Sequence, residues 1–220
     1  GAISAVFCRQ DAAETMAGAA SSSYYNSVNI GLPIATYVLG DATFVVPALV
    51  LQMAVLSPIV IAGLDRSSSG VAKSVLSGLT APVVVAAFAG FAVSAASWTV
   101  PEPVLAPLEI LGGASIPLIL MSFGASLTGE KVLTSHRGPT LTATALKLVG
   151  MPAVAWVVAT LLGLDGQEMY AALILCALPT AQNVYNYAAT YRSGEVICRD
   201  TVFLTTFLAL PAMLLIAGVF

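Results

Sequence analysis

Two segments of this chain combine a proline with side-chain amides and could bind a small molecule. The candidate ligand-contacting residues are Asn26, Asn29, Gly31, Pro33, Pro179, Thr180, Gln182 and Asn183. A proline has no N–H to donate within a helix, and its ring clashes with the carbonyl group four residues earlier, so each segment predicts a broken helix. Side-chain amides offer N–H donors to a carboxylate and oxygen acceptors to a hydroxyl group. Together these features favour a small organic anion as the ligand.

Both segments lie within stretches apolar enough to cross a bilayer. A helix break in hydrocarbon leaves backbone polar groups without water, which is tolerated only where the break is buried in protein or lines a cavity. Where a half-helix restarts, its free N–H groups and the positive end of its dipole favour an anion. Two broken, amide-bearing spans are typical of a transporter core. The alternative stays open that Asn29 and Gln182 only hold neighbouring helices together, at about 0.6 kcal/mol for each bond.

The composition places the chain among membrane proteins. Hydrophobic residues make up 58% of the 220 positions and charged residues 9%, and the mean hydropathy is +0.94. A soluble domain carries about 25% charged residues. We therefore predict an all-α polytopic membrane protein embedded in the lipid bilayer. The net charge of −3 is small and the charges fall in short clusters, so no nucleic-acid partner is expected.

The apolar stretches predict seven complete spans after a short apolar stub, Gly1–Cys8. The most polar linker, residues 65–73, divides the chain into a first unit, residues 1–64, and a second unit, residues 74–220. Basic residues are confined to alternate loops. The loops at 9–14, 65–73, 129–138 and 192–200 hold seven of the eight Lys and Arg residues.

The positive-inside rule gives the orientation of the spans. It makes these four loops cytoplasmic and places the C-terminus outside the cell membrane. The first broken segment, residues 17–40, and the second, residues 169–191, then cross in opposite directions. Two similar elements of opposite direction are what an inverted-topology repeat would contain.

Lys147 is a candidate coupling or charge site. It lies roughly two turns into an expected span, where a charge is costly and marks an ion pathway or a buried pair. Its positive charge could occupy the place of a coupling cation, or it could titrate. The alternative is that its long side chain reaches the cytoplasmic interface.

Three ordered motifs make the chain similar to a known family. They are Asn26–Pro33, Gly112–Leu127 and Ala177–Tyr191. Together they resemble the auxin efflux carrier family in its bacterial form. The resemblance implies ten helices in two inverted five-helix repeats, with crossed, unwound fourth and ninth helices that hold the substrate near the midplane.

On that template the chain resembles a carrier that lacks the first two helices. Residues 1–64 would hold the end of helix 3, the broken helix 4 and helix 5, and residues 74–220 would hold helices 6–10 with the broken helix 9. Asn26 falls where the family keeps a substrate-facing amide, and Pro33 and Pro179 match its two crossover prolines. The family's usual Asn-Pro at the start of the sixth helix is Ala81-Pro82 here.

These features predict a secondary active transporter of small organic anions that works by alternating access. The single histidine, His136, lies in a predicted loop, so neither a membrane-embedded Ser-His pair nor a histidine metal site can form. The chain also has no glycine-rich phosphate loop followed by Lys and Ser or Thr. We therefore expect no enzyme, no metal and no cofactor. The alternative is a non-transporting membrane sensor or scaffold with the same ligand site, and a membrane hydrolase ranks third.

Coupling and assembly stay open at this level. A proton and a sodium ion are the two candidates for a coupling ion, and a homodimer is the assembly considered. Cys8, Cys176 and Cys198 have no CxxC spacing, so we expect no disulfide.

Overall fold

The described part of the chain is built from helices. The computed structural model describes residues 11–65, 73, 76, 79–128 and 131–219. The predicted stub Gly1–Cys8, Arg9 and most of the linker 65–73 lie outside the described residues. Within the described ranges the backbone forms helices and one isolated bridge, but no strand. The prediction of an all-α membrane protein is confirmed.

The structure gives the bounds of the helices and helical turns in the described residues. In chain order they are α2 (Ala12–Ser23), η1 (Ser27–Gly31), α3 (Leu32–Tyr37), η2 (Ala42–Phe44), α4 (Val46–Leu51), η3 (Gln52–Leu56), α5 (Ser57–Leu64), α7 (Pro82–Ala95), α8 (Glu102–Ser126), α9 (Arg137–Ala145), η4 (Leu146–Gly150), α10 (Met151–Leu161), α11 (Gly166–Ala177), α12 (Gln182–Tyr191) and α13 (Glu195–Ala217). Of the short elements, η1, η3 and η4 are π-helical turns and η2 is a 3₁₀ turn.

Three continuous helices in the described ranges are long and apolar enough to cross a membrane. They are Val46–Leu64, Arg137–Leu161 and Glu195–Ala217. Large apolar side chains on these helices face outwards, for example Leu161, which is 81% exposed, and Leu215, which is 74% exposed. A contiguous apolar surface of this kind is unfavourable in water and matches a lipid environment.

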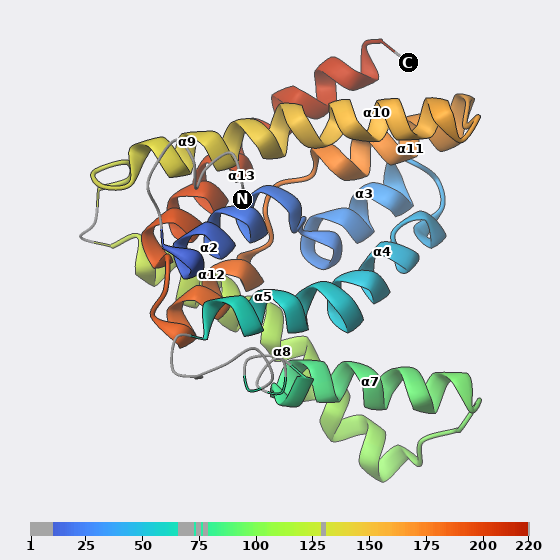
Figure 1. Cartoon of the computed structure of the whole chain (residues 1–220). Coiled ribbons are helices and arrows are strands. Elements are labelled where there is room, and N and C mark those ends of the chain that lie inside the picture. The colour runs from blue at the N-terminus through green and yellow to red at the C-terminus, as the bar shows by residue number, and fades with distance from the viewer. Residues whose placement is uncertain (1–10, 66–72, 74–75, 77–78, 129–130, 220) are drawn as a thin grey trace.

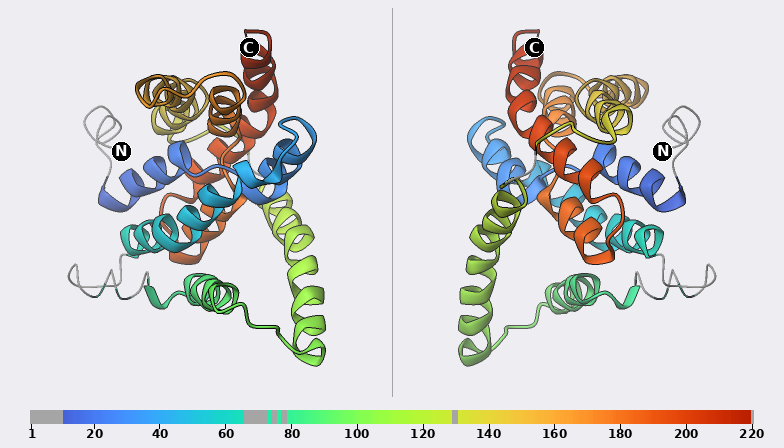
Figure 2. Two further views of the ribbon diagram at one scale, coloured as in Figure 1. Left: turned by 90° about the vertical axis from the view of Figure 1, so that its right-hand side faces the viewer. Right: turned by 90° about the vertical axis from the view of Figure 1, so that its left-hand side faces the viewer.

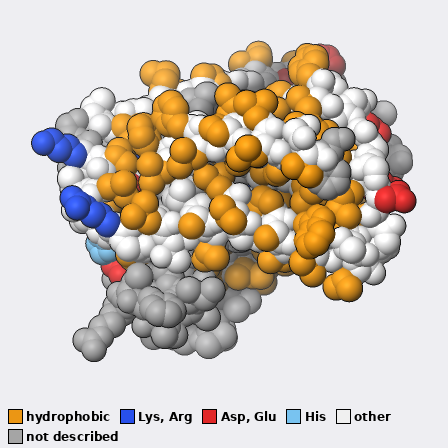
Figure 3. Space-filling model, turned by 90° about the horizontal axis from the view of Figure 1, so that it is seen from above, with side chains coloured by type: hydrophobic (Ala, Val, Ile, Leu, Met, Phe, Trp, Pro, Cys, Tyr) orange, Lys and Arg blue, Asp and Glu red, His pale blue; other side chains and the backbone are white. Residues whose placement is uncertain are grey.

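Charged side chains gather at the two ends of the molecule. Seen from above, Lys and Arg lie at one end and most of the visible Asp and Glu at the other, with an apolar band between them (Figure 3). This arrangement suits helices that cross a bilayer and whose basic loops face one side.

The core forms where helices from both ends of the chain meet (Figure 1). α2 packs against α5, α9 and α13, while α10 pairs with α11. One cluster of buried apolar residues joins Ala35 of α3 to Leu178 and Met213, and a second joins Tyr24 to Val184 of α12. α7 and α8 project from this bundle (Figure 2). The two predicted broken segments therefore meet in the middle of the core.

Each π-turn is followed directly by a helix with a proline in its first turn. η1 precedes Pro33 of α3, η3 precedes Pro58 of α5, and η4 precedes Pro152 of α10. Because proline cannot donate to the carbonyl four residues earlier, a widened turn accommodates its ring without ending the helix. The first segment is broken, as predicted, but the break lies before Pro33, at residues 24–26, and the helix continues through the proline.

Candidate functional site

Two extended segments cross at the centre of the bundle. The first break, residues 24–26, separates α2 from η1, and the second break, residues 178–181, separates α11 from α12. They pair as one antiparallel bridge. The N–H of Asn26 donates to the carbonyl of Pro179 at 2.9 Å. In the other direction, the N–H of Ala181 donates to the carbonyl of Tyr24 at 3.2 Å. Each break thus satisfies backbone groups of the other, as an interruption within hydrocarbon requires.

Three side-chain amides meet beside this crossing. The Nδ2 groups of Asn26 and Asn29 donate to the same oxygen, Oε1 of Gln182, at 2.9 and 3.2 Å. Oδ1 of Asn26 accepts a bond from the backbone N–H of Asn29 at 3.2 Å and so caps η1. Asn26 and Gln182 are buried, and Asn29 is half-buried. The structure therefore brings three of the candidate residues together in one hydrogen-bonded cluster, which we call the amide cluster.

The remaining candidates of the second break have different surroundings. Pro179 and Thr180 are buried within the crossing. The Thr180 hydroxyl donates to the Ser21 carbonyl at 2.6 Å, and its N–H donates to Oγ1 of Thr205 at 3.1 Å. Thr180 therefore ties the crossing to α2 and α13. Asn183 lies in the first turn of α12 and is half-buried.

Gly31 lies close to the second break, whereas Pro33 lies outside the crossing. A Cβ atom at Gly31 would be 3.1 Å from Cδ1 of Leu178 and 3.2 Å from the Asn26 carbonyl oxygen. A larger residue at this position would push the two breaks apart. Pro33 is exposed on α3, beyond the π-turn.

A second set of buried polar groups holds the first break, and sequence reasoning missed it. Nε2 of Gln52 donates to the Tyr25 carbonyl at 2.9 Å, and Oε1 of Gln52 accepts a bond from the Ser27 hydroxyl. The Tyr24 hydroxyl donates to the Gln52 carbonyl at 3.1 Å and lies 2.7 Å from the Ser57 hydroxyl. A lone glutamine within an apolar span was the available signal, because a buried polar group in a membrane needs a partner.

Lys147 is fully buried, with an exposed fraction of 0%. Its Nζ donates to the Cys176 carbonyl at 3.0 Å and lies 5.4 Å from the centre of the Tyr25 ring. The side chain thus turns towards the crossing and is enclosed by protein, whereas the alternative of a side chain that reaches the interface would need it to extend to the surface. It places a positive charge beside the first break.

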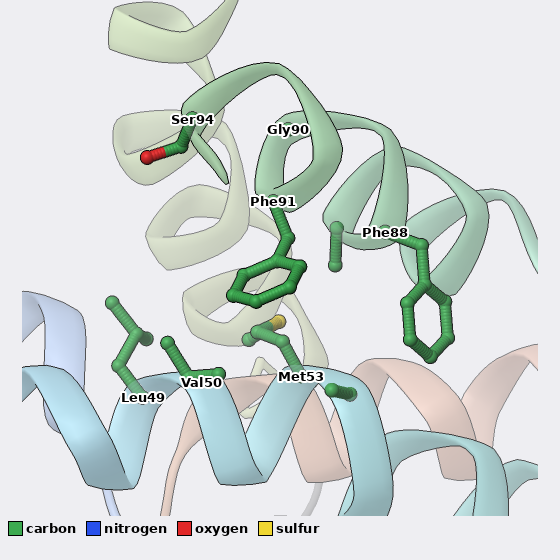
Figure 4. Close-up of a pocket in the computed structure, with 9 residues that line it drawn as sticks. Leu49, Val50, Met53, Phe88, Gly90, Phe91 and Ser94 are labelled. Carbon is green, nitrogen blue, oxygen red and sulfur yellow. The ribbon is translucent and has the colours of Figure 1, made fainter. Parts of the chain in front are cut away.

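A separate cavity of about 400 Å³ lies between the α4–η3 helix and α7. Phe91 of α7 lies over Met53 there, and Phe88 lines the same space (Figure 4). Ser94 is the one polar side chain among its lining residues. This cavity therefore offers a single side-chain donor to an anion, and the crossing remains the candidate site. Among the described residues, no group of three or more His, Cys, Asp and Glu side chains is placed to hold a metal ion.

Paired helix breaks with buried amides, in an all-α membrane protein, are typical of a membrane transporter. Comparison with known families agrees with this class. The family described as "Membrane transport protein" matches residues 66–217, which is more than half of the chain. The chain therefore belongs to this family, that of the auxin efflux carriers, as its three motifs indicate. It is a family of membrane transporters and not of enzymes.

One relative matches a shorter part of the chain. An uncharacterized transporter of Methanocaldococcus jannaschii is 27% identical over 107 residues, which are 49% of this chain and 34% of that protein. The chain thus spans about a third of the length of this relative.

Proposed function

We propose that the protein is a secondary active transporter that moves small organic anions, carboxylates in particular, across the cell membrane by alternating access. The observation that carries this proposal is the convergence of two amide donors, from Asn26 and Asn29, on one oxygen of Gln182. A carboxylate oxygen is a stronger acceptor than an amide oxygen. In the bound state, a substrate carboxylate would take the place of Oε1 of Gln182 and accept both bonds.

The ends of the half-helices add to this preference for an anion. η1 begins at Ser27 and α12 begins at Gln182, each directly after its break, and α12 has no side-chain cap. The N–H groups and the positive dipole at such helix starts stabilise negative charge. Lys147, whose Nζ lies 5.4 Å from the centre of the Tyr25 ring, adds a positive charge to the same region.

The antiparallel pairing of the two breaks supports an inverted-topology arrangement of the broken segments. In carriers of that kind, one group of helices moves against another around the bound substrate. The crossed helices would move against a scaffold formed by the remaining spans, including the projecting helices α7 and α8 (Figure 2). The separation of charge in Figure 3 supports cytoplasmic basic loops and a C-terminus outside the cell.

Uptake into proteoliposomes tests the proposal. A panel of mono- and dicarboxylates is offered at two pH values, with and without sodium, and we expect saturable uptake of at least one of them. Asn26→Ala and Asn183→Ala are compared with Thr36→Ala, whose hydroxyl donates only to the Leu32 carbonyl on the exposed face of α3. If both asparagine variants transport like the wild type, the site is assigned wrongly.

The same preparation separates the transporter from the sensor or scaffold. Saturable binding of a carboxylate without uptake would favour the sensor. Flux that rises in proportion to concentration and never saturates would indicate a channel.

A further inference from the structure

We infer that Lys147 is a tethered cation: its ammonium group occupies the position at the end of a broken helix where carriers with crossed helices bind a free coupling cation. The inference rests on the proposed function, because it concerns how that site is charged. It assigns neither sodium nor potassium to the crossing and predicts a carrier that needs neither ion. Two contacts of Lys147 and its place in the backbone lead to it.

The first contact is with the end of α11. Cys176 is the penultimate residue of this helix, which ends at Ala177, and its carbonyl accepts the bond from Nζ of Lys147 at 3.0 Å. The last four carbonyls of a helix have no partner within the helix and carry the negative end of its dipole. In carriers with broken helices, such half-helix ends coordinate the transported or coupling cation. Here the chain supplies its own cation to that end.

The second contact is with the first break. Nζ of Lys147 lies 5.4 Å from the centre of the Tyr25 ring, within the range of a cation–π interaction. Tyr25 forms the antiparallel bridge with Thr180 of the second break. The ammonium group therefore lies close to both breaks. It faces the Tyr25 ring of the first break, and it donates to a carbonyl at the end of α11, the helix that leads into the second break. An ion bound at the crossing would have the same neighbours.

The third observation is the local backbone of Lys147. The residue lies in the π-turn η4, directly before α10 with its early proline. A π-turn changes the direction in which the following side chains leave a helix and is frequent at functional sites. In the described part of the chain, the Lys147 ammonium group contacts a carbonyl and a ring, not a carboxylate. Its charge is therefore not cancelled by a fixed anion, which leaves it available to balance an anionic substrate.

Thermal unfolding of the purified protein in detergent tests this inference without any substrate. Unfolding is followed in sodium chloride, methylammonium chloride or choline chloride at equal ionic strength. The variants are Lys147→Ala, which opens space for a small cation, and Lys147→Met, which fills the space without a charge. Methylammonium is the probe because it has the size and charge of the end of a lysine side chain.

We expect the wild type and Lys147→Met to unfold at the same temperature in all three salts. Lys147→Ala should unfold at a lower temperature, and methylammonium should raise it in a saturable manner, by about 3–6 °C at ten times Kd. Choline, which is too large for the space, should not. In uptake assays, wild-type transport should be independent of sodium, and methylammonium should restore part of the transport lost in Lys147→Ala.

The inference is overturned if sodium stabilises the wild type in a saturable manner, because a separate cation site then exists. It is also overturned if methylammonium acts equally on all three proteins or on none. The wild-type measurement decides the matter even if Lys147→Ala does not fold. Because unfolding requires no substrate, a protein that transports no carboxylate would contradict the proposed function and leave the cation result standing.

Discussion

Replacing Gln182 with Glu tests whether the amide cluster receives a carboxylate. The two side chains have nearly the same shape, so Gln182→Glu places a carboxylate oxygen where Oε1 now accepts bonds from Asn26 and Asn29 at 2.9 and 3.2 Å. The variant thus carries a permanent imitation of the bound substrate. We expect it to fold and to lose uptake.

The size of the loss follows from the two hydrogen bonds. A bond to a charged acceptor contributes about 1.5–3 kcal/mol and a neutral one about 0.5–1.5 kcal/mol, so the substrate gains the difference, about 1.2 kcal/mol, at each donor. For two donors the total is about 2.5 kcal/mol, or about 70-fold in KM. In Gln182→Glu the tethered carboxylate already holds both donors, and this gain disappears. Repulsion between the two anions increases the loss further.

Initial uptake rates in proteoliposomes, measured over a range of substrate concentrations, give KM for each variant. Gln182→Ala removes the oxygen that the substrate must displace and leaves both donors to the substrate, so its KM should not exceed that of the wild type. Asn186→Asp makes the same change of amide to carboxylate one turn further along α12 and controls for the added charge. Equal losses in Gln182→Glu and Gln182→Ala, or an unchanged KM in Gln182→Glu, would refute the reasoning.

Three further substitutions concern stability and are checked by thermal or denaturant unfolding in detergent. Gly31→Ala should lower the free energy of unfolding by about 1–3 kcal/mol, because its Cβ would lie 3.1 Å from Leu178 Cδ1 and 3.2 Å from the Asn26 carbonyl oxygen. An unchanged unfolding temperature would mean that the two breaks can separate freely. Tyr24→Phe removes a hydroxyl with two buried partners and should lower the free energy of unfolding by about 1–2 kcal/mol. A stabilised variant would contradict the role of this hydroxyl in holding the first break. Gly194→Ala should cost more than about 2 kcal/mol, since φ is +65°, a strained value for any side chain, and its Cβ would overlap the Ala17 methyl group; a neutral effect would show that the turn before α13 adapts.

Composition and motif order were sufficient to predict the class of fold. Few charged residues and apolar stretches of about 20 residues favour helices within a membrane, since each helix satisfies its own backbone groups. The second break was also predictable, because Pro179 lies within the extended segment that separates α11 from α12. Its neighbour Gln182 then begins the next helix, and its amide reaches the first break.

The first break was not predictable in position, and the reason is physical. Proline ends a helix only if its ring cannot be accommodated, and at Pro33 the preceding π-turn η1, with a bond from the Gly31 N–H to the Asn26 carbonyl at 2.8 Å, widens the helix to make room for the ring. The helix unwinds instead at residues 24–26, which hold no proline. Their extended shape depends on backbone bonds to the second break and on Gln52, contacts that no local pattern encodes.

The pairing of the two breaks has a consequence for the synthesis of the protein. Asn26 and Gln182 are 156 residues apart in the chain, a distance that a ribosome covers in about 8–30 s. During that interval the first segment is in the membrane without its partner. Because residues 24–26 contain no proline, the segment can insert as one continuous helix. It would then unwind only when the second segment arrives to pair with it, so the first break is formed at the end of assembly.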